Sequence, residues 1–223
     1  MTALVLDIET IGTNKQEVRD YIAANVKPPA TIKLPASIEK WHKESKAEAV
    51  EEAISRTGLD GAFGQVVCIG FMFEFEASAS AIYGLDEPVL LTELNALMDE
   101  IPRSEWFTTQ IVGHNVHAFD LRFLLQRYIV NGIKPHIVLL RAMNAKPWAN
   151  EACFDTMTQF AGSTNRISLD KLCMALGVPS PKGNMDGSMV SQAVADGRLG
   201  DVVEYCKKDV EATYACWKRM TWN

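Results

Sequence analysis

Short runs of apolar residues along the chain predict a central β-sheet. Strands are expected over residues 4–10, 65–73, 79–83, 111–112 and 152–157. Because successive strand side chains alternate between the two faces of a sheet, the two acids of the first strand, Asp7 and Glu9, point to the same face. Leu4, Leu6 and Ile8 point to the other face, so the carboxylates cannot lie in the core that these three residues form.

Apolar residues at three- and four-residue spacing predict helices after several of these strands. The expected helices cover residues 88–98, 116–131, 168–176 and about 200 almost to the C-terminus. Asp120 falls in the first turns of the second helix, where a carboxylate is favoured. Tyr205 and Asp209 are one turn apart on the last helix and project to the same side. Together with a length of 223 residues, this pattern predicts a single α/β domain, residues 1–223.

The segment over about residues 13–64 departs from this pattern and is expected to be a helical insertion after the first strand. Residues 27–46 hold two glutamates and five lysines, namely Lys27, Lys33, Lys40, Lys43 and Lys46. Trp41 and His42 lie among these lysines, and bases can stack on aromatic rings. The segment is therefore interpreted as a basic surface that holds a phosphate backbone, with a solvated helix face as the alternative.

Composition changes this picture in three respects. The net charge of −6 counts against a nucleic-acid partner unless several of the acids bind metal. Five cysteines without a Cys-x-x-Cys pattern indicate buried, reduced thiols. There is no signal-like N-terminus and no apolar run that would span a membrane, so the prediction is a soluble, cytoplasmic protein without a membrane partner.

The acids of the first strand suggest a metal site. Like charges held a few Å apart raise one another's pKa unless a cation lies between them. Oxygen ligands of this type favour Mg²⁺ or Mn²⁺, although a solvated pair in a surface loop is the alternative. His114 and His117 suggest zinc at first sight, but the sequence offers no matching cysteine pair.

Three motifs in order carry a resemblance to a known superfamily. They are Leu6-Asp7-Ile8-Glu9-Thr10, the run from Gly113-His114-Asn115 through Phe119-Asp120-Leu121, and Tyr205-x-x-x-Asp209. In order and approximate spacing they resemble the DnaQ-like, DEDDy-type 3′→5′ exonucleases. The whole chain most resembles the stand-alone predicted exonucleases of bacteria and phages that are related to the proofreading domain of family B DNA polymerases.

This resemblance implies a ribonuclease H-like fold, with a mixed central sheet flanked by helices, and a metal-dependent 3′→5′ exonuclease that releases nucleoside monophosphates from DNA. Two Mg²⁺ or Mn²⁺ ions are expected on the carboxylates of Asp7, Glu9, Asp120 and Asp209. Tyr205 would orient or deprotonate the attacking water; orientation is favoured, because a phenol with a pKa near 10 is a poor base at neutral pH.

The same resemblance implies a set of substrate contacts. Thr10, Ile11 and Gly12 would frame the terminal nucleotide, Asn115 and Phe119 would contact the sugar or its neighbour, and Lys182 would contact the scissile phosphate. Core packing is the alternative role for Phe119. A solvated loop position is the alternative for Lys182.

Other functions remain as alternatives at this stage. A phosphatase of the haloacid dehalogenase type also begins with a strand that ends in two acids, but Glu9 replaces its second aspartate. A 3′→5′ exoribonuclease of the same fold and a catalytically silent nucleic-acid-binding partner of a polymerase are the other candidates. The expected partners are single-stranded DNA 3′ ends and a separate DNA polymerase, in replication, repair or proofreading within a bacterial or phage-infected cell.

Overall fold

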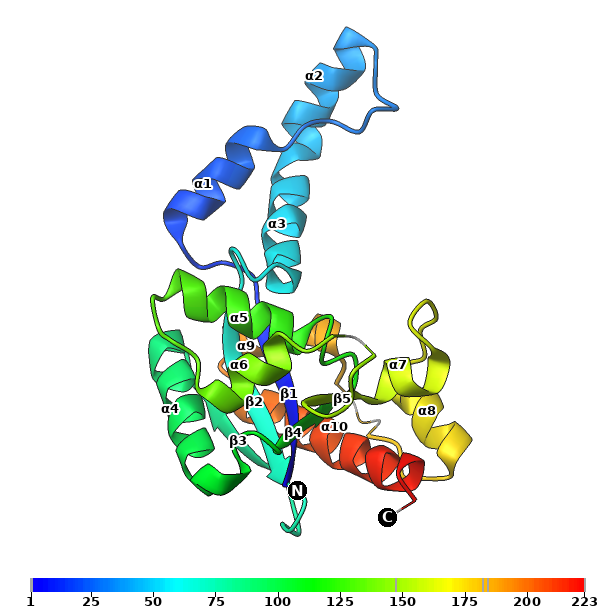
Figure 1. Ribbon diagram of the computed structural model, residues 1–223. Coiled ribbons are helices and arrows are strands. Elements are labelled where there is room, and N and C mark those ends of the chain that lie inside the picture. The colour runs from blue at the N-terminus through cyan, green and yellow to red at the C-terminus, as the bar shows by residue number, and fades with distance from the viewer. Residues whose placement is uncertain (1, 147, 182, 184, 223) are drawn as a thin grey trace. The chain divides into compact units, whose positions relative to one another are not determined.

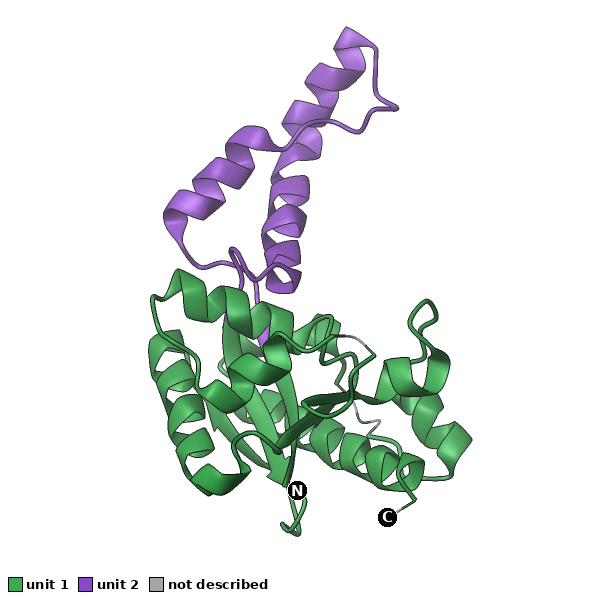
Figure 2. Cartoon of the chain, in the orientation of Figure 1, with its two compact units in different colours: residues 1–9, 66–223 green, residues 10–65 purple. Residues whose placement is uncertain are grey.

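The computed structural model describes residues 2–146, 148–181, 183 and 185–222. The chain divides into two compact units, which Figure 2 shows in different colours. Unit 1 consists of residues 1–9 and 66–223, and unit 2 consists of residues 10–65. None of the described helices is long and apolar enough to cross a membrane.

A five-stranded sheet forms the centre of unit 1, with the strand order β3-β2-β1-β4-β5 (Figure 1). Its strands are β1 (Ala3–Ile11), β2 (Gln65–Phe73), β3 (Ser80–Tyr83), β4 (Gln110–Gly113) and β5 (Cys153–Asp155). Strand β4 runs parallel to both β1 and β5, whereas β3 is antiparallel to β2. The predicted mixed sheet is therefore confirmed, although β5 ends earlier than expected because a helix begins at Thr156.

Helices cover both faces of this sheet. On one face, Leu4, Leu6 and Ile8 pack in a large core with three helices, namely α4 (Glu87–Asp99), α5 (Asp120–Val130) and α6 (Ile137–Met143). On the other face, Val5 packs with Val210 and other side chains of α10 (Leu199–Met220). The shorter helices α7 (Thr156–Ala161), α8 (Leu169–Leu176) and α9 (Val190–Ala195) contact α10. Strand β1 is thus buried between two helical layers.

The predicted helices at residues 88–98, 168–176 and 200 onward are confirmed, but the helix expected from residue 116 begins only at Asp120. Residues 114–119 form a turn instead, in which Asn115 has a positive φ of 61° and Phe119, with φ −112° and ψ −77°, departs from helical geometry just before Asp120. Helix α6 was not predicted, because an apolar run of seven residues does not distinguish a helix from a strand.

Unit 2 consists of three helices and a short 3₁₀ helix. They are α1 (Gln16–Asn25), α2 (Pro35–Glu44), α3 (Lys46–Arg56) and η1 (Thr57–Leu59). The helical character of this segment is as predicted. The expectation that Trp41 stacks on nucleic-acid bases is wrong, because its side chain is buried in the unit and only 7% exposed.

Candidate active site

The two acids of β1 lie on the face of the sheet that α10 covers. Asp7 and Glu9 alternate with Ile8, whose side chain belongs to the core on the opposite face. Glu9 is 8% exposed, so its carboxylate is not a solvated surface group. Ligand atoms of Asp7, Glu9 and Cys206 all lie within 4.8 Å of one another. The alternation in the sequence therefore places the two carboxylates together, as predicted.

Asp120 reaches this strand from the first residue of α5. Its Oδ1 accepts a hydrogen bond from the backbone N–H of Ile8 at 3.0 Å, and its side chain is buried. The turn that precedes it is tight: a Cβ at Gly113 would collide with Val116 and lie 2.9 Å from the Leu6 carbonyl oxygen. Because Gly113 has no side chain, the turn can approach β1 closely. Asp120, which follows the turn, therefore contacts β1 at Ile8, the residue between Asp7 and Glu9.

Asp155 holds this turn in place and was not identified from the sequence. It ends β5, and its two carboxylate oxygens accept hydrogen bonds from the backbone N–H groups of Asn115 (3.0 Å) and His117 (3.1 Å). It also caps α7 by accepting from Met157 N at 3.0 Å. An aspartate between a strand and a helix is a common N-cap residue, and this pattern would have indicated Asp155 from the sequence.

Helix α10 supplies the remaining candidate residues from one of its faces. A Cβ at Gly70 of β2 would lie 2.7 Å from Cys206 Sγ and 2.9 Å from Val210 Cγ2, so α10 packs closely on the sheet at this glycine. Cys206 Sγ donates to Asp7, at 3.5 Å to Oδ2 and 3.7 Å to the carbonyl oxygen. This thiol neighbour of Asp7 was not predicted as part of the site.

Burial raises the pKa of all four carboxylates, and repulsion from the other acids of the cluster raises that of Asp7 and Glu9 further. For Asp7, burial has the largest effect, followed by the charges of Asp120, Glu9 and Asp209, and its pKa lies well above the usual range. The pKa of Glu9 is raised in the same way, by burial and then by Asp209. Burial raises the pKa of Asp120 to about 7 and that of Asp209 to about 6. The four predicted ligands therefore form one electrostatically coupled cluster.

Tyr205 belongs to the same cluster. Burial raises the pKa of its phenol far above the usual value, and the charges of Asp209, Glu9 and Asp7 raise it further. A hydrogen bond between Tyr205 and Asp209 lowers the pKa of the carboxyl group. The hydroxyl of Tyr205 thus remains protonated at neutral pH and can donate a hydrogen bond.

The donor set fits a divalent cation. Among the residues that the structure describes, no lysine or arginine is paired with Asp7, Glu9, Asp120 or Asp209, and the charges that raise their pKa are all acidic. Clustered carboxylates without a protein cation are stabilised by Mg²⁺ or Mn²⁺, whose preferred ligands are oxygens. The protein therefore has an acidic cluster with the composition of a metal site.

The two histidines near the turn have other partners. His114 Nε2 lies 2.9 Å from the Ile167 carbonyl oxygen, and His117 Nε2 lies 2.7 Å from the Ala145 carbonyl oxygen. In both rings Nε2 can therefore donate to a backbone carbonyl, and Nδ1 of His114 also lies 3.0 Å from Thr156 Oγ1.

The residues expected to contact substrate have different surroundings in the structure. Thr10 Oγ1 donates to the Gly58 carbonyl oxygen at 2.6 Å, and Gly12 packs against Ile54, so these residues and Ile11 belong to the framework of unit 2. Phe119 is partly buried and packs on the main core, as its alternative role required.

Asn115 and Lys182 complete the expected contacts. The buried Oδ1 of Asn115 has no hydrogen-bond partner among the described residues, which leaves an acceptor for a ligand group. Lys182 lies outside the residues that the structure describes.

Comparison with known proteins gives a family match and likenesses to solved structures. A family model described as "Predicted 3'-5' exonuclease related to the exonuclease domain of PolB" matches residues 59–222. The structure resembles that of the family B DNA polymerase from the hyperthermophilic archaeon Pyrobaculum calidifontis, with a TM-score of 0.60 and 14% sequence identity. No match was found among curated proteins.

The structural match covers 100% of this chain and 24% of the polymerase chain. The chain therefore spans about a quarter of the length of the protein that it resembles. At this level of identity the likeness concerns the fold, which is the ribonuclease H-like arrangement that the sequence predicts.

Proposed function

The chain belongs to the family of predicted 3′→5′ exonucleases related to the exonuclease domain of PolB, and we propose that it hydrolyses DNA from the 3′ end. The products are nucleoside monophosphates, and the cofactor is Mg²⁺ or Mn²⁺. The observation that carries this proposal is the convergence of three segments on one carboxylate cluster. Asp7 and Glu9 come from β1, Asp120 comes from α5, and Tyr205 and Asp209 come from α10.

The four carboxylates supply the ligands of the proposed mechanism. Two divalent ions held by Asp7, Glu9, Asp120 and Asp209 would activate a water molecule and stabilise the leaving 3′ oxygen. The hydrogen bond from Ile8 N to Asp120 fixes one of these ligands on the rigid strand β1. Such positioning reduces the reorganisation that the site undergoes during the reaction.

Tyr205 orients the attacking water in this proposal. Its pKa is raised far above neutrality, so the phenol donates a hydrogen bond and does not accept a proton from water. The bond between Tyr205 and Asp209 holds the hydroxyl at the edge of the carboxylate cluster. A base other than Tyr205, such as a second water or the bulk solvent, receives the proton.

The substrate contacts of the proposal remain those implied by the family. Thr10, Ile11 and Gly12 frame the terminal nucleotide, and Lys182 contacts the scissile phosphate. The unpartnered Oδ1 of Asn115 supports a contact with the sugar, because a buried amide oxygen accepts a hydrogen bond from a hydroxyl group. Phe119 packs on the core, so its contribution is to support the turn that carries Asn115.

We propose further that unit 2 is an insertion into a single exonuclease domain and that the protein acts on ends produced by a separate DNA polymerase. Most of unit 2 precedes the residues that the family model matches. The likeness to a polymerase chain supports a role in proofreading or repair of newly made DNA.

The proposal is tested with 5′-labelled single-stranded DNA, duplex DNA and single-stranded RNA, each with Mg²⁺, Mn²⁺ or EDTA. The wild-type protein should shorten single-stranded DNA from its 3′ end and should lose this activity in EDTA. Asp7→Ala should abolish shortening. The matched control is Glu93→Ala, which removes an exposed acid on α4 and should retain full activity.

Three results would contradict the proposal. Full activity of Asp7→Ala would exclude the carboxylate cluster as the site. Faster shortening of RNA than of DNA would identify an exoribonuclease. Binding of nucleic acid without shortening under any metal condition would identify a silent binding module.

A further inference from the structure

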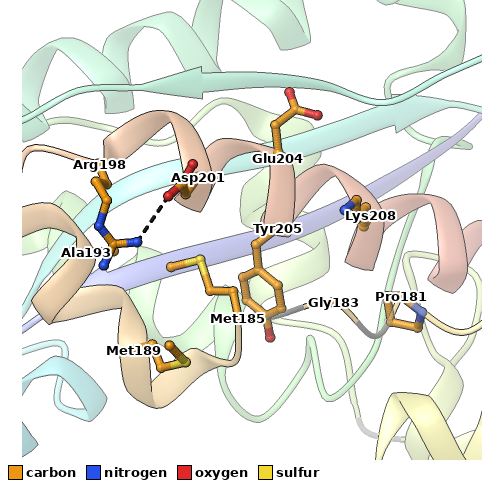
Figure 3. A pocket seen from close by; sticks show the side chains of 10 residues that line it. All are labelled: Pro181, Gly183, Met185, Met189, Ala193, Arg198, Asp201, Glu204, Tyr205 and Lys208. Carbon is orange, nitrogen blue, oxygen red and sulfur yellow. Dashed lines mark hydrogen bonds and ion pairs between the residues drawn. The ribbon is translucent and has the colours of Figure 1, made fainter.

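A cavity of about 320 Å³ lies beside Tyr205, between α10, α9 and the residues that precede α9 (Figure 3). Its volume is at the lower end of the range of about 300 to 1,000 Å³ that is usual for small-molecule pockets. None of the four carboxylates lines it, so the cavity is distinct from the cluster described above.

Tyr205 connects this cavity to the carboxylate cluster. In Figure 3 its ring extends from α10 into the cavity, near Met185 and Gly183. The hydroxyl of the same residue bonds to Asp209 and is influenced by the charges of Glu9 and Asp7. A ligand in the cavity would therefore contact the ring whose hydroxyl belongs to the proposed catalytic centre.

The apolar part of the cavity suits a flat aromatic group. Met185, Met189 and Ala193 contribute to its wall, and Met189 is 41% exposed although it faces this hollow. Methionine adapts its shape to a ligand and makes favourable contacts between sulfur and aromatic rings. Two thioethers and a phenol ring together form a surface on which a nucleobase can pack.

The charged part of the cavity leaves one cation available. Arg198 pairs with Asp196 at 3.2 Å and with Asp201 at 3.0 Å, and Glu204 pairs with Lys207 at 3.0 Å. Lys208 also lines the cavity, and it forms no hydrogen bond or ion pair with another residue that the structure describes. The lining residues carry two cations and two acids, so the cavity has no net charge, and Lys208 is the lining cation that is left to pair with an anion.

We propose that this cavity is a nucleotide subsite, in which a nucleobase packs against Met185, Met189 and the Tyr205 ring while Lys208 pairs with the phosphate. The inference rests on the proposed nuclease function. Two ligands could occupy the subsite. One is a nucleotide of the bound strand next to the scissile phosphate, and the other is the released nucleoside monophosphate. Both present a base and a phosphate to the same groups.

The subsite is tested with Lys208→Gln and with Met189→Glu, which places a negative charge in the cavity. Lys218→Gln on the same helix and Met174→Glu on the exposed side of α8 are the matched controls. Binding of labelled single-stranded DNA and of nucleoside 5′-monophosphate is measured by titration in EDTA at several salt concentrations. KM and kcat for single-stranded DNA are then measured with Mg²⁺.

Loss of a hydrogen bond to a charged group is expected to weaken binding roughly tenfold. If the cavity takes the bound strand, Lys208→Gln raises Kd and KM for DNA and lowers the slope of log affinity against log salt by about 0.7. If it takes the product, the variant instead raises Kd for the monophosphate and leaves DNA binding unchanged. In both cases kcat stays within a few-fold, and Met189→Glu produces the same selective loss.

The proposal is overturned if Lys208→Gln and Met189→Glu match their controls in all of these measurements. Because the titrations are made without metal, this result is separate from a failure of the nuclease function. A wild-type protein that binds nucleotides at the cavity but does not shorten DNA would overturn the proposed function and would support the subsite.

Discussion

Tyr205 is the residue whose role is tested most directly. Tyr205→Phe removes the hydroxyl and retains the ring, so the carboxylates can still bind metal. If the hydroxyl orients the attacking water mainly in the transition state, single-turnover cleavage should fall by about 10²- to 10⁴-fold while DNA affinity is retained. Single-turnover rates and binding titrations of the same variant provide the measurement.

Tyr214→Phe is the matched control for this variant, because Tyr214 also lies on α10 and its hydroxyl donates to the Glu74 carbonyl oxygen at 3.0 Å. Its activity should stay within a few-fold of wild type. A similar result for Tyr205→Phe would remove Tyr205 from the catalytic residues.

The raised pKa values of the carboxylates predict how stability depends on pH. A carboxyl group whose pKa is higher in the folded state binds more protons when folded, so stability falls as pH rises from about 4 through the folded pKa. For Asp209 and Asp120 these folded values are about 6 and about 7. The metal-free protein should therefore melt at a lower temperature at pH 8 than at pH 5.5, and Mg²⁺ or Mn²⁺ should raise the melting temperature more at pH 8.

The control for this prediction is Asp120→Asn, which keeps an oxygen to accept from Ile8 N but removes one titrating charge. Burial lowers the pKa of His114, and a lowered histidine pKa makes stability rise with pH. Both proteins contain His114, so this opposing contribution cancels when the pH dependence of the melting temperature of Asp120→Asn is subtracted from that of the wild type. An equal fall in melting temperature for both proteins would show that titration of Asp120 does not contribute to it.

At the scale of the elements, the packing of α10 on β2 decides whether the site is complete. Gly70→Ala would place a methyl group 2.7 Å from Cys206 Sγ and 3.3 Å from the Cys206 carbonyl oxygen, so the helix must move outward. Overpacking of this kind typically costs about 1–3 kcal/mol. We expect a lower melting temperature and a fall in kcat with a smaller change in DNA affinity.

Gly84→Ala is the matched glycine control, since its new methyl group would lie 3.4 Å from Leu90 Cδ1, an ordinary contact. Its melting temperature and kcat should be close to those of wild type. Circular dichroism melts and kcat measurements compare the two variants. Equal behaviour would mean that α10 tolerates displacement from β2.

The elements that the sequence predicts correctly are those with a long or strongly alternating pattern. Strand β1 follows from its alternation, and α8 follows from the cap Ser168 and from Gly177, which has a φ of 68°. The predicted start of α5 is too early because hydrophobic spacing does not distinguish the turn at residues 116–119 from the first turn of a helix.

The residues of the candidate site also divide into those that a sequence pattern brings together and those that it does not. Asp7 and Glu9 are brought together by strand periodicity, which a sequence displays. Asp155 and Cys206 take part through contacts with residues about 40 and 199 positions away. The sequence indicates Asp155 as an N-cap residue, but its contact with Asn115 and that of Cys206 with Asp7 depend on how the elements pack, which no local pattern specifies.

At the scale of the whole molecule, unit 2 carries the basic segment of an acidic chain. Within it, Lys40 pairs with Glu44 at 3.8 Å and Lys43 pairs with Glu39 at 2.7 Å. All four of these side chains are more than 60% exposed, and such surface pairs exchange readily with other partners. The basic surface predicted from the sequence therefore remains accessible, with part of its charge balanced locally.

Replacing Lys33, Lys40 and Lys43 together by Ala should weaken DNA binding and flatten its salt dependence, with little change in the rate at saturation. Each lost phosphate contact reduces the slope of log affinity against log salt by about 0.7 for a single strand. Lys134, Lys171 and Lys218 of unit 1, replaced together by Ala, form the control. An unchanged slope would assign the lysines of unit 2 to a solvated helix face.

The candidate site joins residues that lie about 200 positions apart in the sequence, and this has a consequence for biosynthesis. Asp7 and Glu9 are translated first, whereas Tyr205 and Asp209 follow about 200 residues later. At typical rates of about 5–20 residues per second, the first pair waits roughly 10–40 s for its partners. A nascent chain that has not yet reached α10 thus carries three of the four carboxylates but neither Tyr205 nor Asp209. Under the proposed function, a chain that stops before α10 would lack a complete catalytic centre.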